Sequence, residues 1–135
     1  MKKIQVHGNK IRYLDYDNFS SKKRENLVLL HGIGASAERW SNVIPFLSKH
    51  FRIIVPDIIG FGYSDKPTVE YNMPFFVKFV EDFLNSLGVK KASIGGSSFG
   101  GLVAAEFAIK NTNMVNKLIL VSPAGAMKTS TKMLE

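Results

Sequence analysis

Four short apolar runs are spaced along this chain, at residues 27–30, 52–55, 92–95 and 118–121. Continuous apolar character over about four residues is typical of a strand that is covered on both faces. Longer stretches with a helical character separate these runs. Strands that alternate with helices predict an α/β fold, with a mostly parallel sheet and helices on both of its faces.

The strongest helical pattern lies between the second and the third run. Its apolar positions recur at intervals of three and four residues: Phe76, Phe79, Val80, Phe83, Leu84 and Leu87. Asn72 and Pro74 fit the start of this helix, and Gly88 fits a position just beyond its end. We expect its aromatic stripe to lie in the core. A second helix is predicted at 99–110.

The first fifteen residues have a different pattern. Segments 3–6 and 10–15 flank the turn-prone triplet His7, Gly8 and Asn9, which predicts an antiparallel β-hairpin ahead of the parallel strands. A short helix is expected at 38–47, where Pro45 interrupts the pattern.

Composition narrows the class of protein. With 135 residues, 45% of them hydrophobic and 21% charged, the chain has the composition of a single globular domain. No apolar run approaches the ~20 residues that a membrane span needs, and the absence of cysteine excludes thiolate metal sites and fits a cytoplasmic location. The net charge of +7 comes from scattered lysines and arginines, so we expect no nucleic-acid partner.

The candidate chemistry lies in the stretch GGSSFGG at 95–101, between the third apolar run and the second helix. Gly96, Ser98 and Gly100 fit the pattern G-x-S-x-G, in which a serine stands at a sharp strand-to-helix turn and bulky neighbours would collide. The Ser98 hydroxyl would face the crevice beyond the sheet, at a helix N-terminus that stabilises negative charge. Taken alone, this pattern leaves a structural turn and a nucleophile equally open.

Three stretches together make the chain resemble the α/β-hydrolase superfamily. They are LLHGIG at 29–34, PDIIGFGYSDKP at 56–67, and GGSSFGG followed by LILVSPAG at 118–125. The second is similar to the D-x-x-G-x-G-x-S-x-x-P loop of the esterase and carbon–carbon hydrolase branches. The resemblance implies that residues 1–125 are the N-terminal part of a hydrolase core domain, and that 126–135 begin a lid or linker.

The resemblance also implies site residues. Ser98 would be the nucleophile of a serine hydrolase that forms an acyl-serine intermediate, and the backbone N–H groups of Ile33 and Phe99 would form an oxyanion hole. The supporting residues would be His31, Gly32, Gly34, Asp57, Gly96 and Gly100. For His31, orienting the oxyanion loop and simply completing a strand end are equally open. The substrate would be a small molecule with an ester, thioester or activated carbon–carbon bond, and no cofactor or metal is implied. Serine at the elbow disfavours the dehalogenase and epoxide-hydrolase branches.

A dinucleotide-binding fold is the competing interpretation. Gly32, Gly34 and Ala37 fit G-x-G-x-x-A after a strand, and Asp57 ends the next strand 25 positions after Gly32. A hairpin ahead of the supposed first strand and the unexplained GGSSFGG stretch count against such an oxidoreductase. A phosphate-binding loop of the Walker type is excluded because Gly101, and not lysine, follows Gly100.

The serine lacks the partners of a catalytic triad. The order in the resembling family is serine, acid, histidine, but only Glu106 and Glu135 are acidic after Ser98, and no histidine follows it. We therefore expect the N-terminal half of a longer hydrolase, inactive by itself. The alternative is a non-catalytic remnant or binding module, completed by a partner along the open edge of the strand at 118–121. With that edge uncovered, we expect marginal stability.

Overall fold

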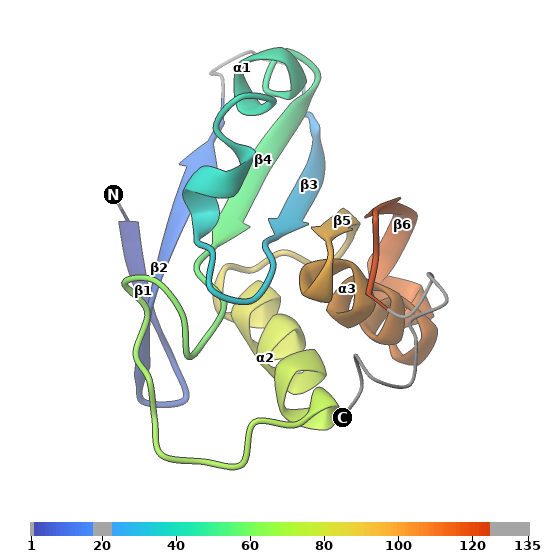
Figure 1. The fold of residues 1–135 in the computed structure, drawn as a ribbon. Helices are drawn as coiled ribbons and strands as arrows, with labels where there is room; N and C mark the ends of the chain where they lie inside the picture. The colour runs from blue at the N-terminus through green and yellow to red at the C-terminus, as the bar shows by residue number, and fades with distance from the viewer. Residues whose placement is uncertain (1, 18–22, 125–135) are drawn as a thin grey trace.

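The computed structural model describes residues 2–17 and 23–124 (Figure 1). In chain order the elements are β1 (Lys2–Val6), β2 (Asn9–Tyr16), β3 (Glu25–Leu30), the 3₁₀ helix η1 (Ala37–Trp40), α1 (Ile44–Leu47), β4 (Phe51–Pro56), α2 (Met73–Ser86), β5 (Ala92–Ser97), α3 (Phe99–Lys110), the 3₁₀ helix η2 (Thr112–Met114) and β6 (Val115–Val121). The predicted strands are all present, as are the predicted helix before the third apolar run and the one at 99–110.

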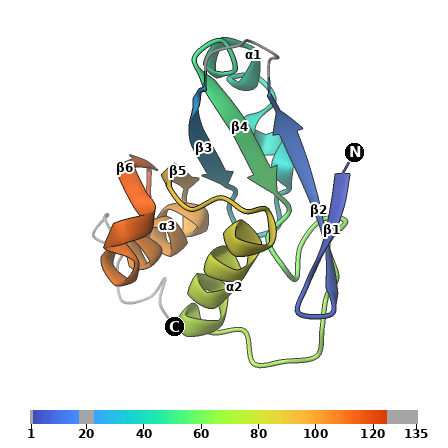
Figure 2. The same ribbon diagram turned by 180° about the vertical axis from the view of Figure 1, so that it is seen from behind.

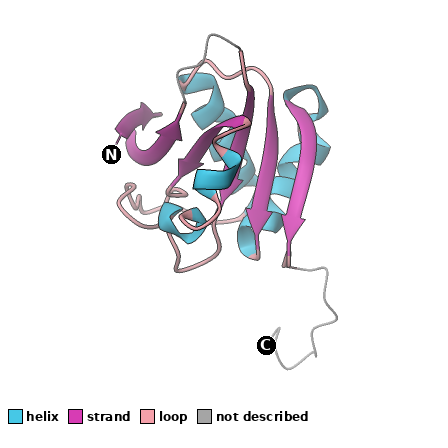
Figure 3. Cartoon of the chain, turned by 90° about the horizontal axis from the view of Figure 1, so that it is seen from above, coloured by secondary structure: helices cyan, strands magenta, loops and turns pink. Residues whose placement is uncertain are grey.

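The strands form one six-stranded sheet in the order β1-β2-β4-β3-β5-β6. The hairpin β1–β2 is antiparallel, and β2 joins β4 in antiparallel register. β4, β3, β5 and β6 pair in parallel, so their carboxyl ends lie at one edge of the sheet (Figure 3). This arrangement confirms the predicted α/β class, including the hairpin at its front.

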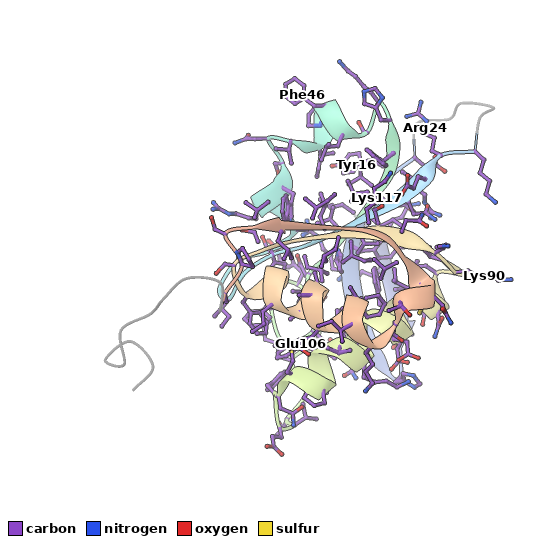
Figure 4. All side chains as sticks on the ribbon, turned by 90° about the vertical axis from the view of Figure 1, so that its right-hand side faces the viewer. Tyr16, Arg24, Phe46, Lys90, Glu106 and Lys117 are labelled. Atoms are coloured by element: carbon purple, nitrogen blue, oxygen red, sulfur yellow. The ribbon has the colours of Figure 1, made fainter. Side chains whose placement is uncertain are left out.

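Helices cover both faces of the sheet, as the continuous apolar runs predict. Along β3, Val28 and Leu30 pack on the side of α2 and α3, whereas Leu27 and Leu29 pack on the side of η1 and α1. Seen from behind and along the sheet, α2 and α3 lie on one face and α1 lies on the other (Figures 2 and 4). Each central strand is therefore buried on both sides.

Helix α2 begins and ends where its sequence signals predict. The Asn72 side chain accepts a 2.9 Å hydrogen bond from the Phe75 N–H, and Pro74 stands in the first turn. Beyond the last turn, Gly88 adopts φ +71°, a left-handed conformation that glycine reaches without strain. The predicted aromatic stripe is buried: Phe76, Phe79 and Phe83 are at most 5% exposed.

The single helix expected at 38–47 is wrong. Two short helices stand there, η1 and α1, and Pro45 lies in the first turn of α1. Proline is tolerated at that position because its missing N–H has no partner within the helix. Pro45 therefore starts a helix and does not interrupt one.

Strand β6 lies at the edge of the sheet, as predicted for the last apolar run. Leu118, Ile119, Leu120 and Val121 are 40–46% exposed, although their pattern is that of a buried strand. Burial on both faces needs neighbours, and among the described residues β6 pairs with β5 along one edge and contacts α3. The marginal stability expected from the open edge stays a prediction.

Two further expectations are not tested by the fold. The segment 126–135, expected to begin a lid or linker, lies outside the described residues. Among the described helices, none combines the length and the apolar character needed to cross a membrane. The cytoplasmic location stays a prediction.

Candidate active site

Ser98 stands at a sharp corner between β5 and α3. Its backbone has φ 54° and ψ −119°, a conformation that residues with a side chain rarely adopt. Main-chain bonds hold the corner: the Ser98 N–H donates to the Val121 carbonyl at 3.1 Å, and the Ser98 carbonyl accepts from Ala124 N–H at 2.9 Å. The residue is exposed, whereas Gly96 and Gly100 beside it are buried. The bend therefore places one hydroxyl at the surface.

The glycines around the corner are required by space. A Cβ at Gly96 would overlap the backbone of Gly100 and Gly101, and a Cβ at Gly100 would overlap the carbonyl oxygens of Leu30 and His31. A Cβ at Gly101 would lie 2.9 Å from the Pro123 Cβ. The predicted reason for G-x-S-x-G, crowding on both sides of the serine, is therefore present in the packing.

The loop after β3 approaches Ser98 from the opposite side. A Cβ at Gly32 would lie 3.4 Å from the Ser98 Cβ, so the loop backbone passes directly over the serine. Gly34 adopts φ +73°, which turns the chain away again. Within residues 2–17 and 23–124, the N–H groups of Ile33 and Phe99 have no acceptor, because Phe99 is the first residue of α3 and Ile33 makes no turn bond. Two backbone donors thus remain available beside the hydroxyl.

His31 joins this loop to the loop that follows β4. Its Nε2 accepts a 2.9 Å hydrogen bond from the Ile58 N–H, so Nδ1 carries the proton and donates to the Gly32 carbonyl at 2.7 Å. The imidazole is fully buried, and burial lowers its pKa below the ordinary 6.5. Both ring nitrogens make hydrogen bonds, so the neutral ring holds the Gly32 segment in place. Of the two roles left open by the sequence, this contact supports orientation of the loop.

Asp57 holds the same region together through hydrogen bonds to its carboxylate. It is completely buried, and its carboxylate accepts from the Ala37 N–H at 2.7 Å and from the Tyr63 N–H at 2.8 Å. A Cβ at Gly62 would overlap this carboxylate, and Gly62 adopts φ +56°. The loop therefore wraps tightly around one acid. Asp57 has no free oxygen for a ribose, which counts against the dinucleotide interpretation.

Arg12 is the site residue that the sequence did not indicate. It reaches from β2 to Asp57, with Nη1 3.1 Å from Oδ1, and its guanidinium also donates to Glu38 on η1, with Nη1 2.7 Å from Oε2. The bonds to Glu38 and the charge of Asp57 raise the pKa of Arg12, and the same contact lowers the pKa of Glu38. Arg12 is 6% exposed and keeps Asp57 from being an isolated buried charge.

An apolar groove opens beside the two backbone donors. Its volume is about 620 Å³. The lining residues are Ile33, Gly60, Phe61, Lys66, Pro67, Thr68, Val69, Tyr71, Phe76 and Phe99. The Tyr71 ring lies against Gly60, where a Cβ would come within 2.8 Å of it, so that glycine lets the aromatic wall close in. The groove is large enough for a small organic molecule.

His7, His50 and Glu106 lie away from Ser98, and Glu135 falls outside the described residues. His7 is in the hairpin turn, with Nε2 3.2 Å from the Asp82 carboxylate, and His50 precedes β4 at the opposite end of the sheet. Glu106 lies on α3 beside a groove toward α2. In the described ranges, the Ser98 hydroxyl has no hydrogen-bond partner, and no three acidic, histidine or cysteine side chains are placed to hold a metal.

Comparison with known families adds to this geometry. Residues 25–135 match the family described as the alpha/beta hydrolase fold. The chain is 35% identical over 126 residues to 2-hydroxy-6-oxo-6-(2'-aminophenyl)hexa-2,4-dienoic acid hydrolase of Metapseudomonas resinovorans, covering 90% of this chain and 42% of the relative. It is 38% identical over 103 residues to 2-hydroxymuconate semialdehyde hydrolase of a Pseudomonas species, covering 73% and 36%.

Solved structures also resemble this chain. A meta-cleavage product hydrolase from Pseudomonas fluorescens superposes with a TM-score of 0.86 at 32% identity, over 95% of this chain and 47% of that one. A bacterial membrane phospholipase A superposes with a TM-score of 0.88 at 31% identity, over 96% and 41%. The chain thus spans less than half the length of these relatives.

Proposed function

The chain belongs to the alpha/beta hydrolase fold family, and from that membership we propose that Ser98 is the nucleophile of a hydrolase that works through an acyl-serine intermediate. The observation that carries the proposal is the corner itself. A serine with φ 54° is exposed at the carboxyl end of β5, between glycines that have no room for a side chain. Backbone strain of about 1–3 kcal/mol persists where surrounding contacts enforce it, and such positions cluster at active sites.

The proposed first step joins Ser98 to the substrate. Its Oγ attacks a carbonyl carbon, the electron pair of the C=O bond moves onto oxygen, and the hydroxyl proton passes to a base. The N–H groups of Ile33 and Phe99 would stabilise the resulting oxyanion, and each such donor is worth about 3 kcal/mol in the transition state. The bond to the leaving group then breaks and that group takes a proton, after which water releases the acyl group from Ser98.

The general base is assigned to the rest of the whole protein. His31 is buried with both ring nitrogens engaged, so it serves the Gly32 segment and not the hydroxyl. Since the chain spans less than half the length of its relatives, we propose that the acid and the base belong to a further part of the polypeptide. By itself the 135-residue chain would not turn over substrate.

For the substrate we propose a small molecule whose cleaved bond is an activated carbon–carbon bond. The names of several relatives describe oxo-dienoic acid or semialdehyde hydrolases, which supports this class over simple esters. The apolar groove beside Ile33 and Phe99 would receive the part of the molecule that does not react. One relative is a soluble epoxide hydrolase, 38% identical, but serine at the elbow speaks against that chemistry.

The test is covalent labelling of the polypeptide encoded by the whole reading frame. A fluorophosphonate probe should label it, Ser98→Ala should abolish the labelling, and the neighbouring Ser97→Ala should keep it. Labelling that survives Ser98→Ala, or that is lost equally in both variants, would overturn the assignment.

A non-catalytic remnant remains the second candidate, favoured by one observation: no described side chain makes a hydrogen bond to the Ser98 hydroxyl. It predicts that no oxo-dienoic acid or p-nitrophenyl ester is turned over faster by the whole protein than by its Ser98→Ala variant. Turnover above that control would reject it.

A further inference from the structure

A second hollow lies at the opposite end of the sheet from Ser98. Its volume is about 900 Å³. It is lined by Asp17, Lys23, Arg24, Glu25, Asn26, Arg52, Gly88, Val89, Lys90, Lys91 and Asn116. These residues precede or begin the parallel strands β3, β4, β5 and β6, whereas the serine follows β5. A strand of six residues is about 20 Å long, so the hollow and the Ser98 site are separate.

The lining carries an excess of three positive charges. The carboxylate of Glu25 is already engaged: it accepts from Ser93 Oγ at 2.6 Å and pairs with Lys117 at 3.7 Å. Arg52 is held by Asp15, with Nη2 2.8 Å from Oδ2. Within the lining, the negative charge of Glu25 and the positive charge of Arg52 cancel. The excess of three positive charges therefore comes from the remaining lining residues.

Three lysines carry most of that excess. Within the described part of the chain, the ammonium groups of Lys23, Lys90 and Lys91 have no carboxylate within ion-pair distance. Like charges gathered around one hollow repel each other, and an anion between them removes that repulsion. Figure 4 shows Arg24 and Lys90 at the same end of the sheet.

Local contacts hold the backbone around the hollow. Gly88, in its left-handed conformation, turns the chain from α2 into the segment that holds Lys90 and Lys91. The Asn26 side chain donates to the Lys91 carbonyl at 3.3 Å, and Arg24 Nη1 donates to the Ser48 carbonyl at 2.6 Å. The starts of β3 and β5 are thereby tied together around the hollow.

We propose that this hollow binds a phosphoryl group, as a phosphate monoester or a pyrophosphate. A phosphoryl group carries up to two negative charges and several acceptor oxygens, so it can contact several ammonium groups at once, whereas a carboxylate offers a single charge. The side-chain amides of Asn26 and Asn116 already donate one N–H each, to the Lys91 carbonyl at 3.3 Å and to Glu25 Oε1 at 3.2 Å, and the second N–H of each amide can serve a ligand. The volume admits a group larger than phosphate itself, within the size range of small-molecule sites.

The experiment titrates the polypeptide encoded by the whole reading frame with inorganic pyrophosphate at low ionic strength, by isothermal calorimetry and by amide chemical shifts. We expect saturable binding, with shifts centred on Asn26, Lys90 and Lys91. The variant K90E/K91E should weaken binding by about tenfold or more. Its matched control is K3E/K10E, which makes the same change in net charge on exposed residues of the hairpin outside the hollow, and should stay within about threefold.

The source of the phosphoryl group is distinguished by a second arm with vesicles that contain phosphatidic acid. Vesicle binding that pyrophosphate displaces assigns the group to a lipid headgroup, and binding of pyrophosphate alone assigns it to a soluble ligand. Equal weakening in both double variants, or no saturable binding in either arm, overturns the proposal. Ser98→Ala should bind pyrophosphate like the unmodified chain, so failure here is distinct from failure of the hydrolase assignment. Thermal melting of each variant verifies that it is folded.

Discussion

The two ends of the parallel strands are built in different ways. At the carboxyl ends of β3, β4 and β5, the chain packs against itself so closely that glycines are needed, and the charged and imidazole groups of Arg12, Asp57 and His31 are buried. At the amino ends, exposed lysines surround an open hollow. Packing density therefore decides how much unfolding free energy a substitution removes. Four measurements can test this difference between the two ends.

Removal of the buried acid should have the largest effect. Asp57→Ala leaves the N–H groups of Ala37 and Tyr63 without an acceptor and leaves Arg12 without its buried partner. Deleting one member of a buried ion pair costs about 3–5 kcal/mol of unfolding free energy. Urea unfolding followed by circular dichroism would measure this. Asp65→Ala is the control, because that exposed carboxylate accepts one bond, from the Lys10 N–H, and its loss should cost about 1 kcal/mol.

A single methyl group at the serine corner should have the next largest effect. Gly100→Ala places a Cβ against the carbonyl oxygens of Leu30 and His31, and such overpacking costs about 2–3 kcal/mol. Gly8→Ala serves as the comparison, since Gly8 has φ +80° but open space around it, and should lose about 1 kcal/mol from backbone strain alone. Equal losses in the two variants would argue against steric crowding as the reason for the corner glycine.

A pH titration should test the buried imidazole of His31 at the carboxyl ends of the strands. Because burial lowers the pKa of this imidazole in the folded chain, protonation favours the unfolded chain, and stability is lost as the pH falls below the ordinary 6.5 toward the lowered value. The slope can reach about 1.4 kcal/mol per pH unit. Unfolding free energies of the unmodified chain and of His31→Gln, measured between about pH 5 and 7.5, should differ in slope. Parallel curves would contradict the buried neutral imidazole.

Substitutions at the amino ends should have the smallest effect on stability. Lys90→Ala and Lys91→Ala remove exposed charges that make no ion pair among the described residues, so each should change the unfolding free energy by less than about 0.5 kcal/mol. A slight gain in stability is expected at low ionic strength, because repulsion between neighbouring lysines is relieved. A loss above 1 kcal/mol in either variant would remove the contrast between the two ends.

Local signals explain why much of the fold could be predicted from the sequence. Asn72, Pro74 and Gly88 mark the ends of α2 by the conformations they favour, and Gly96 and Gly100 mark the corner by the space they leave. Such signals lie within a few residues of the feature they specify. The prediction of a single helix at 38–47 was wrong for a related reason. A proline is compatible both with the interruption of a helix and with the first turn of a new one.

Contacts between distant segments explain what the sequence could not indicate. Arg12 lies in an ordinary strand pattern, and its partner Asp57 is 45 positions away. The hollow at the amino ends collects lysines that are scattered along the chain, and only the strand order brings them together. The exposure of β6 depends on which segments lie beside it. The apolar residues of the strand itself do not indicate this.

The corner at Ser98 is fastened to the least protected strand of the sheet. Its amide is tied to Val121, the last residue of β6, and its carbonyl to Ala124 just beyond. Fraying of that outer strand would release the bend and let the hydroxyl drift from the two backbone donors. Reactivity at Ser98 should therefore rise and fall with the anchoring of β6, so that slow amide hydrogen exchange at the corner would mark a competent nucleophile.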